Sequence, residues 1–285
     1  MPADLPALLE DLAAETQVTQ DMLAGRDAAA WLLPTPAAGW TIHDQISHLA
    51  FFDETATLAA TDPDRFRQQA AELMALGDAF PDQVARRYRA MPAPDLMDWF
   101  RRARADLIAT FGAADPAARL PWYGPDMSPA TSVTARLMET WAHGQDVADT
   151  LQVTRAPTAR LRHIARLGVR TFGFTHRLHG LPEPGVPVRV DLTAAGGGTW
   201  DWGPDDAKDT VCGPAVDFCL VVTQRRHVDD TSLEVDGPVA AQWMRIAQAF
   251  AGPPGPGRQP AAHRRADVPG PDSEPGAPLS GDEAP

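Results

Sequence analysis

The sequence predicts an α+β protein in which a helix bundle precedes a smaller mixed unit. In the first half, apolar residues recur with helical period in several long stretches. Alternation typical of a strand first occurs at residues 186–193. Toward the C-terminus the chain becomes rich in proline and glycine and poor in apolar groups, a composition typical of disorder. We therefore expect a bundle over residues 1–155, an α+β domain over residues 156–251 and a disordered tail over residues 252–285.

Local signals place the helices of the first half. Residues 5–24 carry leucine, threonine and methionine side chains along one stripe, as in an amphipathic helix. Thr41, followed three residues later by Asp44, is typical of a helix N-cap, and the helix that starts there should end near Asp62. The other bundle helices are expected at residues 63–77, 95–111 and 130–151, with an irregular segment at residues 116–129.

The second half has a different pattern of apolar residues. Alternation over residues 186–193 predicts a strand, and a glycine-rich turn leads into a second strand that ends at Trp202. This mixture of short strands and helices predicts a small α+β domain. The other elements expected in it are a helix at residues 163–179, a helix at 214–226, a short strand at 232–235 and a last helix at 238–250.

The composition restricts the class of protein. A hydrophobic content of 44% and a charged content of 22% are typical of a globular protein in water. The net charge of −13 argues against nucleic acid and anionic membranes as partners. We find neither an apolar run of the roughly 20 residues that a membrane helix needs nor the basic start of a secretory signal. Cys212 and Cys219 are expected to be buried small hydrophobes rather than a disulfide, and the expected location is the cytoplasm.

The most informative motif is Glu139 and His143, four residues apart on an expected helix. Residues at i and i+4 lie one above the other, so that a carboxylate and an imidazole there can hold one divalent metal. His48, on the helix that starts at Thr41, completes a His/Glu/His set if the two helices pack together. Such a set leaves a coordination position open, as in catalytic zinc sites. The alternative is a surface salt link on one helix and a core histidine bound by Asp44 on the other.

Two motifs carry a resemblance to a known family. Residues 40–49, Trp-Thr-Ile-His-Asp-Gln-Ile-Ser-His-Leu, and residues 139–146, Glu-Thr-Trp-Ala-His-Gly-Gln-Asp, together resemble the N-terminal metal-binding domain of mycothiol-dependent maleylpyruvate isomerases. Residues 200–226 look like the C-terminal domain of that family. The chain to about residue 257 also resembles an actinobacterial metal-binding group of the same superfamily. The resemblance implies a DinB-like four-helix bundle followed by a small α/β sterol-carrier-like C-terminal domain.

The resemblance also implies site residues and cofactors. It places the metal ligands at His48, Glu139 and His143, and it implies zinc or another divalent metal, with mycothiol as a thiol cofactor. The active-site arginine of the family corresponds to Arg225, and Arg226 is a neighbour that can substitute for it. These residues depart from the usual family pattern, because Val-Thr-Gln precedes the arginine here.

Other polar residues have competing interpretations. Asp44 is expected to orient the metal-binding histidine of its own helix. Asp146 either orients the histidine one turn before it, contacts the ligand, or is a surface carboxylate. His43 is expected to be solvated or part of the helix cap. His176 and His179 lie one turn apart without a third ligand nearby, so we expect a solvated helix end rather than a second metal site.

Three functions remain open from the sequence. In the first, a metal-dependent isomerase or transferase activates a small thiol for attack on a small electrophilic molecule, while Arg225 binds a carboxylate. In the second, a hydrolase uses metal-bound water. In the third, a non-enzymatic metal-containing protein binds an apolar ligand. A three-ligand site without an obvious fourth protein ligand favours chemistry over binding alone.

Overall fold

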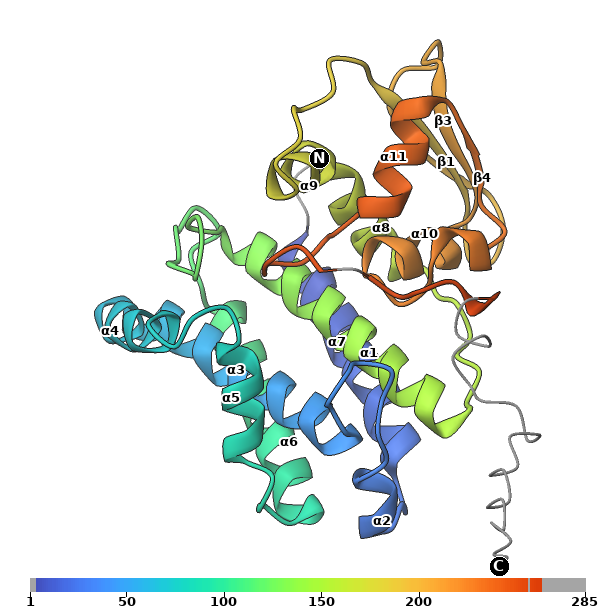
Figure 1. The fold of residues 1–285 in the computed structure, drawn as a ribbon. Coiled ribbons are helices and arrows are strands. Elements are labelled where there is room, and N and C mark those ends of the chain that lie inside the picture. Colours follow the sequence, from blue (N-terminus) through green and yellow to red (C-terminus); the bar gives the residue numbers. More distant parts are fainter. Residues whose placement is uncertain (1–3, 256, 263–285) are drawn as a thin grey trace, which may run out of the picture.

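The chain forms an α+β structure in a computed structural model, which describes residues 4–255 and 257–262 (Figure 1). Its first part is helical, as predicted. Among the described residues, no helix combines the length and the apolar character needed to cross a membrane. The helices of this part are α1 (Leu5–Leu23), α2 (Ala28–Trp31), α3 (Ile42–Thr61), α4 (Pro63–Met74), α5 (Phe80–Arg87), α6 (Ala93–Gly112) and α7 (Pro129–Leu151).

Four long helices, α1, α3, α6 and α7, form a bundle. In it α3 packs against α6 and α7, and α1 packs against α7. Helix α3 starts with the predicted capping box between Thr41 and Asp44, and Ser128 caps α7. The facing sides of the helices bury apolar residues such as Leu12 and Leu137, which excludes water from the centre of the bundle. The long α3 and α7 thereby lie side by side and present their polar residues to each other.

The second part carries a four-stranded sheet. The strand order is β2-β1-β3-β4, with β1 parallel to β3 and the other two pairs antiparallel. Alternate residues of β1 (Val188, Val190 and Leu192) are buried in a core shared with the nearby helices, as the predicted alternation requires. The elements are α8 (Leu161–Arg170), α9 (Phe172–Leu178), β1 (Val188–Thr193), β2 (Thr199–Trp202), β3 (Asp209–Pro214), α10 (Ala215–Val222), a 3-10 turn (Val228–Asp230), β4 (Glu234–Asp236) and α11 (Pro238–Ile246).

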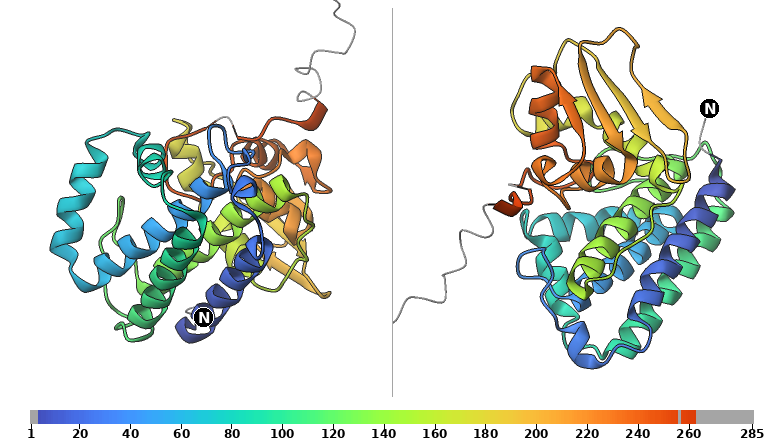
Figure 2. Two further views of the ribbon diagram at one scale, coloured as in Figure 1. Left: turned by 90° about the horizontal axis from the view of Figure 1, so that it is seen from below. Right: turned by 90° about the vertical axis from the view of Figure 1, so that its right-hand side faces the viewer.

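The two parts share a hydrophobic core. Met138 and Trp141 of α7 belong to the same buried cluster as residues of α8, α10 and the sheet. The connection between α7 and α8 is tied back to α1, because Arg155 and Arg160 both pair with Glu15. The side view shows the sheet-bearing part resting over α7 (Figure 2). The predicted boundary between two domains falls in this connection and stays a prediction.

Several elements differ from the sequence prediction. The expected helix over residues 163–179 is two helices, α8 and α9, which meet at Thr171. The expected helix over residues 214–226 is the shorter α10, which ends at Val222 because Gln224 adopts a left-handed conformation with φ 59°. The residues directly before α10 form β3, a strand that was not predicted from the sequence. Cys212 lies on β3 and Cys219 on α10, and both thiols are free, as expected; Cys219 is buried as predicted, whereas Cys212 is only partly buried. The short helices α2 and α5 were also not predicted.

The described part of the C-terminal segment lies against the body of the protein. Arg258 pairs with Asp146 at 3.0 Å and with Asp149 at 3.2 Å, both on α7. These contacts differ from the disorder that the composition predicts for residues 252–285, because an arginine in this segment reaches two carboxylates. The rest of the segment, residue 256 and residues 263–285, lies outside the described residues.

Candidate metal centre

Helices α3 and α7 bring the three predicted metal ligands together. His48 comes from α3, and Glu139 and His143 lie one turn apart on α7. Their ligand atoms all lie within 4.8 Å of one another. Nε2 of His143 is 3.0 Å from Oε2 of Glu139, and Nε2 of His48 is 3.7 Å from the same oxygen. The three side chains therefore converge on one point and are placed to share one ion.

A neighbouring amide fixes the orientation of one imidazole. Nδ1 of His143 contacts Oε1 of Gln45, and the amide nitrogen of Gln45 donates to the hydroxyl of Thr35 at 2.8 Å. Because an amide oxygen only accepts, Nδ1 of His143 donates in this contact, and Nε2, which faces Glu139, is the nitrogen left to bind a metal. The sequence analysis missed Gln45. Its position one turn before His48 on the same helix is the signal that could have found it.

Aromatic rings surround the two histidines. Trp40 stacks on His143 with ring centroids 5.8 Å apart and planes inclined by 17°. Phe52 lies against His48 at 4.5 Å, and the two imidazoles are 4.4 Å from each other. The indole N–H of Trp40 donates to Asp82 at 2.6 Å, which holds the ring in place. This packing lowers the local dielectric constant and strengthens electrostatic interactions inside the cluster.

The environment sets the protonation states of the cluster. Burial, followed by the charge of His143, lowers the pKa of His48 to about 3. Burial would raise the pKa of Glu139, but hydrogen bonds and charge interactions with His143 and His48 outweigh it and hold that pKa well below its usual value. At neutral pH, His48 is therefore neutral and Glu139 ionised. Metal ligation requires these states.

The donor set fits a divalent metal such as zinc. Two imidazole nitrogens and one carboxylate oxygen are common zinc ligands, and the ordered tautomer of His143 is the usual mark of a metal-binding histidine. With three protein ligands, one position of a tetrahedral site is left for another molecule.

A cavity of about 430 Å³ adjoins the cluster, and His48 and Glu139 form part of its wall. Volumes of this size are typical of small-molecule sites. Its lining comes from both parts of the chain, since the segment after α11 faces bundle helices across it. The other residues of the wall are Phe52, Met74, Gly77, Asp78, Phe80, Pro81, Trp122, Tyr123, Met127, Thr131, Ala135, Arg136, Met138, Leu167, Ala249, Phe250, Ala251, Gly252 and Pro253.

The structure does not bring the two predicted C-terminal arginines to this cavity. Arg225 pairs with Asp146 at 2.8 Å, and Arg226 pairs with Asp149 at 2.6 Å. Neither arginine lines the cavity, and Asp146 does not line it either. One oxygen of Asp146 binds Arg225 and the other binds Arg258. These three predicted residues therefore join the C-terminal part to α7 instead of facing the metal ligands.

Three other expectations need correction. Asp44 does not touch His48; it caps α3 and pairs with Arg89 at 2.8 Å, while Nδ1 of His48 has no partner among the described residues. His43 is buried, not solvated, and its Nε2 lies 2.9 Å from the carbonyl oxygen of Met91. A solvated helix end is expected at His176 and His179, but His176 is fully buried.

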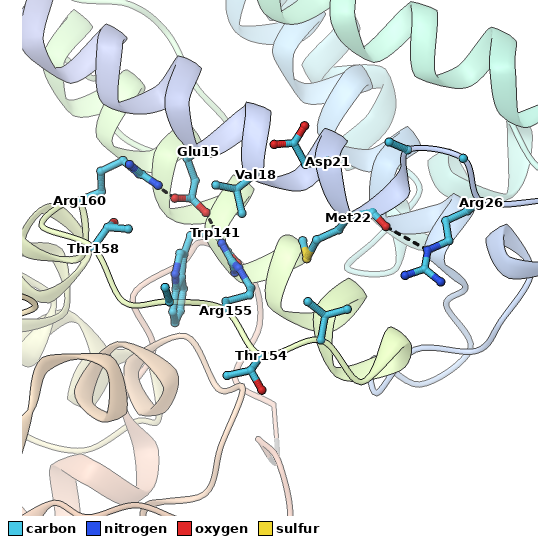
Figure 3. A pocket seen from close by; sticks show the side chains of 14 residues that line it. Glu15, Val18, Asp21, Met22, Arg26, Trp141, Thr154, Arg155, Thr158 and Arg160 are labelled. Carbon is cyan, nitrogen blue, oxygen red and sulfur yellow. Dashed lines mark hydrogen bonds and ion pairs between the residues drawn. The ribbon is translucent and has the colours of Figure 1, made fainter.

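A second cavity, of about 730 Å³, lies between α1 and the connection that follows α7 (Figure 3). Glu15 stands between Arg155 and Arg160 in its wall, beside the ring of Trp141. Trp141 lies on α7 between the two metal ligands of that helix and, at 100° per residue, points away from both of them. This cavity includes none of the converging ligands.

Comparison with known proteins identifies the family. The family described as mycothiol maleylpyruvate isomerase N-terminal domain matches residues 12–148, which contain all three converging ligands. Two Mycobacterium tuberculosis proteins, both described as uncharacterised (MT0041 of strain CDC 1551 and Rv0036c of strain H37Rv), are each 45% identical to the chain over 257 residues. The match covers 90% of this chain and 100% of each relative. The chain belongs to the maleylpyruvate isomerase-like family.

Solved structures show the same fold. A crystal structure of the mycothiol-dependent maleylpyruvate isomerase superposes with a TM-score of 0.56 at 13% identity, covering 83% of this chain and 95% of the other. A point mutant of that enzyme gives a TM-score of 0.57 at 15% identity, covering 80% of this chain and 91% of the other. The likeness therefore spans the bundle and the sheet-bearing part of the family member.

Proposed function

We propose that this member of the family is a metal-dependent enzyme that uses mycothiol, or a similar small thiol, to isomerise or transfer a group of a small electrophilic molecule. One observation carries the proposal: the cluster of His48, Glu139 and His143 opens onto a cavity of about 430 Å³. Metal ligands at the wall of such a cavity are typical of a catalytic site rather than a structural one. The thiol is suggested by the solved relatives, which are described as mycothiol-dependent.

The residues of the cluster have different roles. His48, Glu139 and His143 would hold the metal, and Gln45 would keep His143 in the tautomer that ligation needs. A divalent metal bound there supplies Lewis acidity, which lowers the pKa of a thiol or a water molecule. Two neutral imidazoles and one carboxylate neutralise only half of a divalent charge. The site therefore favours an anionic ligand such as a thiolate.

The aromatic wall has a separate role. Phe52 and Trp122 line the cavity beside the cluster, and Phe52 also packs on His48. If a thiolate were bound there, these rings would exclude water around it, which would keep it reactive toward an electrophile.

Metal content tests the ligand set. We expect about one divalent metal per chain in the purified protein, measured by elemental analysis, and loss of stoichiometric metal in His143→Ala, because two ligands rarely retain zinc. His163→Ala is the matched control: this histidine pairs with Asp11 outside the cluster and is partly exposed. Full metal occupancy in His143→Ala would refute the ligand assignment.

A measurement of thiol binding distinguishes the proposed thiol-dependent enzyme from a hydrolase and from a non-enzymatic binding protein. Calorimetry is done with mycothiol and with its S-methyl derivative, on metal-loaded and on chelator-treated protein. We expect mycothiol to bind the loaded protein more tightly than the S-methyl derivative, with release of a proton that buffers of different ionisation enthalpy detect. Equal binding of the two compounds would mean that the sulfur does not reach the metal, and the thiol part of the proposal would then be abandoned.

A further inference from the structure

An arginine that the sequence analysis did not single out lines the cavity beside the metal ligands. Arg136 lies on α7, one turn before Glu139, and both belong to the cavity wall. We infer that Arg136 is the anion-binding residue of this cavity and that the ligand it selects is a small organic carboxylate with an apolar, preferably aromatic, body. This inference rests on the proposed function in one respect: the cavity would be the substrate site of that enzyme.

The first argument is the unused hydrogen-bonding capacity of Arg136. A guanidinium carries five N–H donors in a planar fork. Among the described residues, the hydrogen bond of Arg136 comes from Nε alone, to Oδ1 of Asp53 at 3.2 Å. Its Nη2 is buried and has no partner in the described part of the chain. Because a buried donor without an acceptor is costly, this side chain is placed to donate to a ligand oxygen.

The second argument is the local charge. Asp53 is shared by two buried guanidiniums, since Arg104 also binds it, at 2.7 and 3.2 Å. The side chains of Asp53, Arg104 and Arg136 are exposed by only 0, 3 and 4%. One carboxylate between two guanidiniums leaves one positive charge in this group, while the nearby carboxylate of Glu139 in the cavity wall is bonded to His143 and His48. A buried charge needs a counter-charge, and a ligand carboxylate supplies one while matching the fork of the guanidinium in two parallel bonds.

The third argument is the nature of the remaining wall. Phe52, Phe80, Trp122 and Tyr123 all line the cavity, and their rings lie 5.2–6.3 Å apart in a connected group. The guanidinium carbon of Arg136 lies 5.9 Å from the centroid of Phe52, so the charged group and the aromatic group adjoin. Aromatic faces at these spacings accept another ring in stacked or edge contact. The ligand therefore needs a charged end and an apolar end.

A neutral analogue tests the charge requirement without altering the protein. Calorimetry is done with cinnamate and with cinnamamide, which have the same shape but differ in charge. We expect cinnamate to bind the protein at least tenfold more tightly. Each compound is measured on metal-loaded and on chelator-treated protein, whose fold is checked by circular dichroism. Equal affinities for acid and amide would overturn the inference, as would acid binding that requires the metal.

Variants assign the effect to one residue. Arg136→Gln should weaken the binding of cinnamate at least tenfold and leave the binding of cinnamamide unchanged. The affinity of Arg136→Lys for cinnamate should lie between those of the wild type and Arg136→Gln, because lysine keeps the charge but loses the planar fork of donors. The fold should hold, since Asp53 keeps both bonds from Arg104. Arg101→Gln, at an exposed arginine of α6, is the matched control. If Arg136→Gln binds cinnamate as tightly as the wild type and keeps its metal, the inference is overturned. If the wild-type protein binds no metal, only the proposed function is overturned.

Discussion

Replacing Asp146 with asparagine should destabilise the protein without removing the metal. The side chain of Asp146 is 2% exposed and binds Arg225 through one oxygen and Arg258 through the other. Breaking a buried ion pair by removing one partner costs about 3–5 kcal/mol. Here the lower end applies, because Arg225 keeps the carbonyl oxygens of Ala142 and Thr223 and Arg258 keeps another carboxylate. A loss of about 3 kcal/mol lowers the melting temperature of a chain of this size by about 6 °C.

The assay is thermal unfolding of wild-type and variant protein with bound metal quantified in each. Asp64→Asn is the matched control, since this carboxylate is 93% exposed and pairs with Arg67 one turn away on α4. Its melting temperature should change by about 1 °C or less, as is usual for exposed pairs. An unchanged melting temperature in Asp146→Asn would refute the structural role. Loss of metal in that variant would show instead that Asp146 supports the ligands on α7.

Three further outcomes follow from the structure. Thr41→Ala removes the cap of α3 and should cost about 1 kcal/mol of folding stability, measured by urea unfolding. Burial raises the pKa of the Cys219 thiol, so in a Cys212→Ser background we expect no reaction with a disulfide reagent until the protein unfolds; rapid reaction in native buffer would contradict this. Metal-free protein should lose stability as the pH falls below about 6.5, because the pKa of His48 is near 3 when folded and the unfolded chain takes up the proton first. The slope is at most about 1.4 kcal/mol per pH unit for this group, and His48→Asn should flatten it.

The bundle helices could be predicted because their signals are local. The cap formed by Thr41 and Asp44 and the apolar stripe of α1 depend only on neighbouring residues, and both are present in the structure. Strand β3 could not be predicted, because Val211 and Cys212 are its only adjacent apolar residues and two residues do not define a period. It is defined instead by parallel pairing with β1, for example Val190 with Val211, which is distant in the sequence.

The candidate site shows the same division between local and distant information. The spacing of Glu139 and His143 is local to one helix, whereas the contribution of His48 required two helices distant in the sequence to pack together, which the resemblance implied. Gln45 and Arg136 matter only because α3 and α7 pack together and because the cavity forms above them. The two C-terminal arginines were placed in the cavity by the resemblance alone. In the structure they pair with carboxylates near the C-terminal end of α7, which lie closer to them than the cavity does.

Helix α7 explains why chemistry is concentrated at one point. Arg136, Glu139, His143 and Asp146 follow one another at spacings of three and four residues, so they form a single polar stripe on a largely buried helix. Buried polar groups are stable only when partnered. Arg136 pairs with Asp53 of α3. Asp146 pairs with Arg225 and Arg258 of the C-terminal part. Glu139 and His143 bond to each other, to His48 and to the side-chain amide of Gln45 on α3. Ion pairs of Arg136 and Asp146 therefore hold the two ends of the stripe, and the potential metal ligands lie at its centre.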